Sequence, residues 1–166
     1  MKVIKNVLPK KVQEQLKDFI FSKCPLYYLH NVTFKGDKKY CPAFGNSLIK
    51  NDAVVSEQAS LLNVFKETIK GNVINANLIV QLPLNSKVIS KVDQIHIDND
   101  EPHQVFLYYV NDSDGDTVIY KNKKEWKRFT PKQGSMITFD GSLYHTAEQP
   151  KKGTRCVINL NVTSPK

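Results

Sequence analysis

The sequence predicts a mainly β fold, a sandwich or jelly roll, preceded by two helices. Apolar residues recur at helical spacing only in the N-terminal part of the chain. From residue 74 onward, short strand-like stretches follow one another closely, with turn residues between them. With 166 residues, the chain is long enough for one domain with a sizeable core. We therefore expect a single domain over residues 1–166, with a helical front at 1–71 and a β core at 72–166.

Two helices are expected in the front part. The first covers residues 10–22, after Pro9, and has apolar residues at helical spacing, namely Val12, Leu16, Phe19 and Ile20. The second lies between Ser56, a typical N-cap residue, and Gly71, a typical C-cap residue, and its apolar residues are Leu61, Leu62, Phe65 and Ile69. Residues 24–55 carry aromatic residues among turn signals, and we assign no helix or strand to them.

The β core is expected to consist of short strands separated by turns. The candidate strands are residues 74–82, 91–98, 104–110, 117–120, 126–129, 135–139 and 155–162. Residues 111–115, Asn-Asp-Ser-Asp-Gly, separate two of these strands as a hairpin turn would.

Candidate metal ligands lie in the sequence His96-Ile97-Asp98. If this stretch is a strand, His96 and Asp98 point to the same face, because side chains alternate with period two. His145, just after the expected strand at 135–139, supplies a second imidazole. Two histidines and one carboxylate that leave coordination positions open are typical of non-haem Fe(II) oxygenases. His103 follows a proline that breaks the alternation, and we expect it not to be a ligand.

Arg155 begins the last expected strand, ten residues after His145. Its guanidinium group is always charged and can hold an anionic co-substrate beside a metal through paired hydrogen bonds. Structural roles remain as alternatives for each candidate. His96 and Asp98 can form a surface pair, His145 can be a buried core histidine, and Arg155 can belong to a surface ion pair.

Taken together, these residues resemble the 2-oxoglutarate/Fe(II)-dependent dioxygenases, and within them the prolyl-hydroxylase-like branch. The matching pieces follow the family's order and spacing, and they are His96-Ile97-Asp98, residues 106–111, Asp114-Gly115-Asp116-Thr117, Pro131-Lys132-Gln133-Gly134, His145 and Arg155. The stretch Asn75-Ala76-Asn77-Leu78 is also similar to small phage-encoded members. The resemblance covers residues 72–162 and does not extend to the first 70 residues.

The resemblance implies a double-stranded β-helix with Fe(II) inside its open end, held by His96, Asp98 and His145. It also implies 2-oxoglutarate and O2 as co-substrates, with ascorbate as a candidate reductant. Arg155 matches the family position that binds the far carboxylate of 2-oxoglutarate. Tyr109 matches a tyrosine that adds a hydroxyl hydrogen bond in prolyl hydroxylases, although a packed ring alone would also explain it. The implied reaction decarboxylates 2-oxoglutarate to succinate and CO2 and hydroxylates a C–H bond.

The favoured substrate is a protein or peptide side chain, because residues 108–111 and the position of Arg155 match the prolyl-hydroxylase-like branch. Nucleic-acid demethylases of the AlkB type usually carry a second arginine six residues later, where this chain has Asn161. Prolyl hydroxylases often have a bulky aromatic residue there, so Asn161 also departs from their pattern. A dioxygenase that oxidises nucleic acids or nucleotides, a hydrolytic zinc enzyme, a cupin-like metal-binding module and a non-catalytic nucleic-acid-binding module are the alternatives.

Composition and charge set broader expectations. The net charge of +8 comes from 24 lysines and arginines against 16 acidic residues, and it allows nucleic acid or another acidic partner. No apolar run is long enough to span a membrane, and the N-terminus lacks the apolar region of a signal peptide. Three cysteines make neither metal-type spacing nor an even disulfide set. We expect a cytoplasmic, reduced protein that makes no membrane contact.

Substrate selectivity is expected to come from loops around the metal-bearing strands. Two segments are candidates, residues 32–52 and residues 99–104, the second of which directly follows Asp98. We expect deletion of residues 36–39 to leave metal and 2-oxoglutarate binding intact while changing turnover of the substrate.

Overall fold

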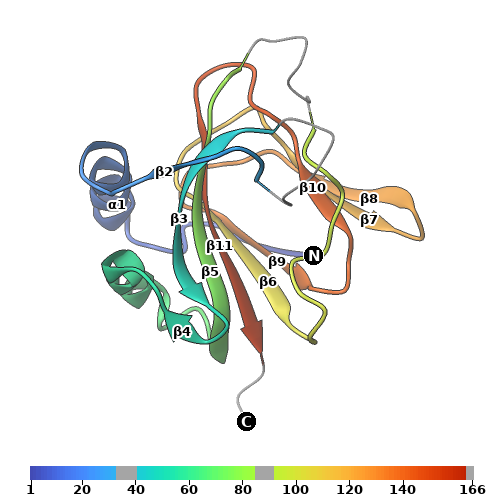
Figure 1. The fold of residues 1–166 in the computed structure, drawn as a ribbon, viewed down its shortest axis with the longest axis horizontal. Helices are drawn as coiled ribbons and strands as arrows, with labels where there is room; N and C mark the ends of the chain where they lie inside the picture. The colour runs from blue at the N-terminus through green and yellow to red at the C-terminus, as the bar shows by residue number, and fades with distance from the viewer. Residues whose placement is uncertain (33–40, 85–91, 164–166) are drawn as a thin grey trace.

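The computed structural model describes residues 1–32, 41–84 and 92–163 (Figure 1). The residues expected to form a deletable loop, 36–39, lie outside this part of the chain. In chain order, the elements are β1 (Lys2–Ile4), α1 (Lys10–Ser22), β2 (Tyr27–Leu29), β3 (Ala43–Lys50), β4 (Ala53–Val54), η1 (Glu57–Phe65), β5 (Asn72–Gln81), β6 (Gln104–Tyr109), β7 (Thr117–Lys121), β8 (Lys124–Phe129), β9 (Met136–Asp140), β10 (His145–Ala147) and β11 (Arg155–Thr163).

The described strands form two antiparallel sheets (Figure 1). The large sheet has the strand order β1-β9-β6-β11-β5-β3-β2, and β4 pairs with β3 at its side. The small sheet has the order β10-β7-β8. Two isolated bridges, Val92 with Glu148 and His96 with His145, join residues 92–96 to the β10 segment. The predicted fold class, a mainly β jelly roll with supporting N-terminal helices, is confirmed.

Strand β11 lies in the middle of the large sheet, between β5 and β6. Its side chains alternate between two environments, as the period of a strand requires. Ile158 and Leu160 belong to the apolar core on the helix-covered face. Val157 belongs to a second apolar cluster, on the face toward the small sheet, together with Leu107 and Ile119. The polar residues of β11 therefore have a defined face, and that face is the one toward the candidate site.

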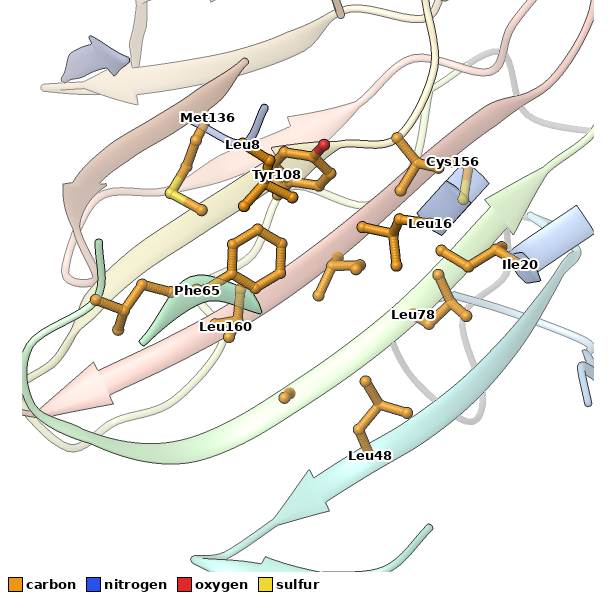
Figure 2. Close-up of a cluster of buried hydrophobic side chains, with 14 of the residues drawn as sticks. Leu8, Leu16, Ile20, Leu48, Phe65, Leu78, Tyr108, Met136, Cys156 and Leu160 are labelled. Atoms are coloured by element: carbon orange, nitrogen blue, oxygen red, sulfur yellow. The ribbon is translucent and has the colours of Figure 1, made fainter. Parts of the chain in front are cut away.

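The helix predicted over residues 10–22 is confirmed as α1. Its buried residues Leu16 and Ile20 pack with Leu78 of β5 and Cys156 of β11 in the core (Figure 2). Both helical elements lie on the same side of the large sheet, away from β7, β8 and β10 (Figure 1). In the described part of the chain, no helix is both long and apolar enough to cross a membrane.

The second predicted helix is a 3-10 helix, η1, rather than an α-helix extending toward Gly71. The Ser56 hydroxyl caps its start by accepting a hydrogen bond from the Gln58 backbone N–H, as expected. In a 3-10 helix, residues three apart lie on one face. Ala59, Leu62 and Phe65 have this spacing, and all three pack in or against the core. The residues of η1 that contact the core therefore recur every third position, as expected for a 3-10 helix.

The predicted strand at 91–98 is wrong as a continuous strand. In the described residues 92–98 only Val92 and His96 pair with a neighbouring segment, each through an isolated bridge. The Gln94 carbonyl lies 2.8 Å from the Nδ1 atom of His96, so it bonds a side chain instead of a neighbouring strand. The candidate ligands His96 and Asp98 therefore lie in a segment that is not a continuous strand.

Residues 24–55 are more regular than predicted. β3 runs through Ala43–Lys50 and pairs with β5, and its Leu48 is fully buried. The segment at 32–52 is therefore in part a sheet strand and not only a surface loop. Short strands β1, β2, β4 and β10 were likewise not predicted. In these five strands, apolar and polar residues do not alternate clearly along the sequence. β3 is interrupted by a register shift, and the other four span only two or three residues each.

Residues 111–115 do not form a hairpin turn. β6 pairs with β9 and β11, whereas β7 pairs with β8 and β10, so this segment crosses from one sheet to the other. Asn111 fixes the crossing: its amide donates to the Thr154 carbonyl at 2.9 Å and accepts from the Cys156 backbone N–H at 2.9 Å. Residues 111–115 therefore connect the large sheet to the small sheet.

Replacing Phe65 tests whether η1 is anchored through the core. Phe65 is buried and lies 4.9 Å from the Tyr108 ring, centroid to centroid. We expect Phe65→Ala to lower the free energy of unfolding in urea by about 3–5 kcal/mol, the usual loss for a buried aromatic residue. The control Val64→Ala, at a neighbouring exposed position, should change it by about 0.5 kcal/mol or less. Equal losses for both variants would contradict this anchoring.

Candidate metal centre

Three predicted ligands come together in the structure. The Nε2 atoms of His96 and His145 lie 3.3 Å and 3.4 Å from the same carboxylate oxygen, Oδ1 of Asp98. All three potential ligand atoms lie within 4.8 Å of one another. Side chains of Asp98 and His145 are 11% and 6% exposed, so the donors are largely shielded from water. One cation at their centre would meet all three.

Hydrogen bonds orient both imidazole rings toward this centre. The Nδ1 atom of His96 lies 2.8 Å from the Gln94 carbonyl, and that of His145 lies 3.2 Å from the Leu143 carbonyl. A carbonyl only accepts, so each Nδ1 carries the proton and each Nε2 is left with a lone pair. Metal-binding histidines are commonly fixed in this way.

The arrangement of the three ligand atoms is stable only with a positive charge between them. Two Nε2 lone pairs face a carboxylate oxygen, and this arrangement is repulsive unless a proton or a metal ion lies between them. Burial lowers the pKa of His96, but hydrogen bonds to Asp98 and Gln94 outweigh it, and the pKa is raised. Burial raises the pKa of Asp98, yet hydrogen bonds from His145, His96 and Asn159 outweigh it and hold the pKa well below its usual range. The site therefore favours a cation, and its donor set fits Fe(II).

Arg155 is buried near the triad and is held by three hydrogen bonds. Its Nε donates to the Gly115 carbonyl at 3.0 Å, Nη1 to Gln81 Oε1 at 3.0 Å, and Nη2 to Thr117 Oγ1 at 2.8 Å. A guanidinium carries five N–H donors, so one remains on each terminal nitrogen. Two parallel donors of this kind match a carboxylate. The alternative of a surface ion pair is wrong, because Arg155 is only 3% exposed.

A buried carboxyl group, Asp93, lies behind Arg155. Gln81 connects the two, since its Oε1 accepts from Arg155 and its Nε2 donates to Asp93 at 2.9 Å. Gln149 donates to the other Asp93 oxygen at 3.1 Å. Burial raises the pKa of Asp93, and the charge of Arg155 opposes this shift. Gln81, Asp93 and Gln149 thus fix the guanidinium group by a network that sequence patterns did not indicate.

Tyr109 reaches this network through Thr117. Its hydroxyl donates to Thr117 Oγ1 at 2.8 Å, the oxygen that also accepts from Arg155. The ring is fully buried and stacks on Phe129 with centroids 5.1 Å apart. Burial raises the pKa of Tyr109 to about 12, so its hydroxyl stays protonated at neutral pH. Thr117 therefore stands between Tyr109 and Arg155, and the predicted contact of Tyr109 with a co-substrate remains a prediction.

Gly115 allows the sheet crossing to approach Arg155 closely. A Cβ atom at this position would lie 2.5 Å from the Glu148 carbonyl oxygen and 3.1 Å from Arg155 Cδ. Any larger residue would push the crossing away and remove the carbonyl that orients Nε. Close packing against Glu148 and Arg155 therefore explains why a glycine is present at position 115.

His103 lies outside the triad, as predicted. Its Nδ1 atom lies 2.7 Å from the Glu101 carbonyl. The ring packs against Gly141 so closely that a Cβ atom on residue 141 would lie 2.3 Å from the His103 Nε2 atom. The ring is therefore fixed by packing against Gly141 rather than directed at the ligand cluster.

A single cavity joins the two halves of the site. It has a volume of about 50 Å³ and is lined by both triad histidines, by Arg155 and by Thr117. The rest of its lining is mixed: Leu107 and Val157 are among the apolar residues, and Gln81 and Asp93 are among the polar ones. An anion held by Arg155 would therefore lie in the same cavity as the two histidine ligands.

No protein-family model matches the chain, and no curated protein matches it in sequence. Solved structures do match its fold. A 2OG-Fe(II) oxygenase family oxidoreductase from Burkholderia pseudomallei aligns over 96% of this chain and 83% of its own, with a TM-score of 0.74 and 11% identity. A Pseudomonas putida prolyl-4-hydroxylase aligns over 97% and 91%, with a TM-score of 0.66 and 12% identity.

A further match has a different activity. The α-ketoglutarate-dependent carbocyclase of nogalamycin biosynthesis aligns over 98% of this chain and 78% of its own, with a TM-score of 0.63 and 11% identity. The protein therefore has the fold of the 2OG-Fe(II) oxygenases. The resemblance to the branch that contains prolyl hydroxylases is confirmed at the level of the fold.

Removing single ligands tests the triad. We expect His96→Ala and Asp98→Ala to abolish Fe(II) binding measured anaerobically, because each removes one of three converging donors. His103→Ala should bind Fe(II) like the parent protein, since His103 is outside the cluster. Unchanged iron affinity in Asp98→Ala would show that the metal, if bound, is held elsewhere.

Metal affinity should also depend on pH. His96 must lose its proton to bind a metal, and its raised pKa widens the range in which protons compete. The apparent affinity for Mn(II) should therefore fall as the pH decreases through and below the His96 pKa, by up to about tenfold per pH unit for each proton displaced. Competition titrations between pH 6 and pH 8, each buffered, measure the slope. A flat profile would contradict proton competition at His96.

Proposed function

We propose that this protein is an Fe(II)- and 2-oxoglutarate-dependent oxygenase that hydroxylates a C–H bond on a protein or peptide side chain. The observation that carries the proposal is the cavity that both histidines of the His-Asp-His triad share with a buried, pre-oriented arginine. A hydrolytic zinc site or a cupin-like binding module needs the triad but has no use for Arg155.

The chain's own residues supply position and shielding. His96, Asp98 and His145 would hold Fe(II), which when bound supplies the oxidative chemistry with 2-oxoglutarate and O2. Arg155 would bind the far carboxylate with its two remaining N–H groups, and Thr117 would keep the guanidinium plane fixed. Leu107 and Val157 would give the bound co-substrate an apolar contact surface within this cavity.

The hydroxylase reaction is our choice within a broader class. The fold also serves a carbocyclase, so the fold alone leaves the outcome of oxidation open. The prolyl-4-hydroxylase among the matching structures favours hydroxylation, and the sequence resemblance at 106–111 and Arg155 favours the same branch. A peptide substrate is proposed on this basis.

Co-substrate binding tests Arg155 directly. We expect Arg155→Ala to weaken 2-oxoglutarate binding by about 2–5 kcal/mol, the usual loss when one partner of a desolvated charge pair is removed. Tyr109→Phe should cost about 0.5–1.5 kcal/mol, because it removes one hydrogen bond to Thr117. Isothermal titration with Mn(II) in place of iron gives both values. If Arg155→Ala remains folded and binds as tightly as the parent, the anion site is elsewhere.

Product analysis tests the reaction class. With Fe(II), 2-oxoglutarate and O2, the protein should release succinate, and a peptide library incubated with it should contain members heavier by one oxygen atom, detected by mass spectrometry. Asp98→Ala should give neither signal. Succinate release together with a cyclised or epimerised small molecule, and no oxidised peptide, would replace the hydroxylase assignment by another reaction of the same fold.

A further inference from the structure

Resting on this proposed function, we propose that the groove opening onto the triad recognises an uncharged, extended peptide main chain through four asparagine side-chain amides. These are Asn75, Asn77, Asn159 and Asn161, which we call the asparagine cluster. The groove has a volume of about 710 Å³ and is lined by all four residues together with His96 and Asp98. A substrate lying in it would therefore contact the cluster and reach the metal centre.

The cluster is built by strand register. On the neighbouring strands β5 and β11, Asn77 lies opposite Asn159 and Asn75 lies opposite Asn161. Side chains directly opposite each other in an antiparallel pair have Cβ atoms about 4.5–5.5 Å apart. The residues between them, such as Ala76 and Leu160, belong to the core on the other face. The four amides therefore share one face and form a compact group on the floor of the groove.

Fold stability does not explain this choice of residues. Asparagine is depleted in strands, and these are two of the central strands of the large sheet. The other face of the same two strands is strongly apolar, with Leu78 and Ile158 fully buried. A local departure from strand propensity in an otherwise consistent sheet is expected where function requires it.

Most of the hydrogen-bonding capacity of the cluster is unused. Among the described residues, the amides of Asn77 and Asn161 make no hydrogen bond. Asn75 uses only its oxygen, which accepts from the Asn51 backbone N–H at 3.1 Å. Asn159 donates to Asp98 Oδ2 at 3.0 Å, but its own oxygen is buried without a partner. Buried polar groups normally have partners, so these donors and acceptors are available to a ligand.

The lining of the groove carries little charge. Apart from the metal ligands His96 and Asp98, Lys50 is the one lysine, arginine, histidine or acidic residue among the described lining residues. A phosphate-bearing polymer is bound mainly by lysine and arginine contacts to its backbone. Among the described residues, the lining therefore offers few lysine or arginine contacts, and a neutral ligand fits this described lining better than a nucleic acid does.

A peptide main chain matches the amides in both chemistry and spacing. Each peptide unit offers one donor and one acceptor, and a side-chain amide can answer both. An extended chain rises about 3.3 Å per residue, so residues two apart present their N–H and C=O groups to the same side at about 6.6 Å. Asn75 and Asn77, two apart on β5, repeat at the same interval. Asn159 then links the bound segment to Asp98.

Side-chain amide signals in NMR can test this recognition without turnover. Protein labelled with ¹⁵N at asparagine, first metal-free and then loaded with Zn(II), is titrated with a blocked hexapeptide of alternating glycine and alanine. Hexapeptides with a central aspartate or lysine, and a hexathymidylate, are the comparison probes. We expect the neutral hexapeptide to shift the Nδ2 signals of Asn77 and Asn161 and to bind more tightly than the charged probes.

Substitutions identify the residues responsible. Asn77→Leu and Asn161→Leu should each weaken binding of the neutral hexapeptide by about tenfold, because each removes one or two hydrogen bonds. Asn63→Leu, at an exposed position on η1, is the matched control and should have no effect. If Asn161→Leu does not fold, the half-buried Asn77 still decides the outcome.

Three results would overturn the proposal: no shift of the cluster signals, stronger binding of hexathymidylate than of the neutral peptide, or an equal loss in Asn63→Leu. These outcomes are separate from the proposed oxygenase function. If the peptide binds as expected but the protein releases no succinate from 2-oxoglutarate in the presence of Fe(II) and O2, peptide recognition stands and the oxygenase assignment falls.

Discussion

The alternation of side chains along β11 is the constraint on which the rest of the structure depends. Every second residue of this strand faces the apolar core, where Ile158 and Leu160 are buried. The intervening residues face the site, beginning with Arg155 at one end and continuing through Asn159. A shift of one residue in register would bury the polar set in the core and expose the apolar set. Core packing therefore fixes the position of the functional side chains.

Burial and charge act together around this strand. Arg155 is a buried cation, and it is tolerated because Gln81, Thr117 and the Gly115 carbonyl satisfy part of its donor set. The Asp93 carboxyl group is connected to Arg155 through Gln81 rather than by a direct contact. The triad differs from Arg155 in charge, because it combines one carboxylate with two imidazoles that can be neutral. One site is thus prepared for an anion and the other for a cation, within the same cavity.

Much of this arrangement could be predicted from the sequence, for definite reasons. The strands β5, β6, β9 and β11 were predicted because their alternation or apolar content is clear, and the triad was predicted because His96 and Asp98 are close in sequence. β3 was missed because Gly45, Asn46 and Ser47 interrupt its apolar pattern. Gln81, Asp93 and Thr117 were missed because only the packing of distant segments brings them to Arg155, and single polar residues carry no periodic signal.

The two isolated bridges of residues 92–98 give the ligand cluster a second role. In the described part of this segment, backbone pairing to the neighbouring strand is limited to Val92 and His96, yet the segment provides two of the three donor atoms. A ligand held jointly by His96, Asp98 and His145 would connect the segment to β10 in addition to the backbone hydrogen bonds between them. Free energy of binding at this place is then also free energy of local folding.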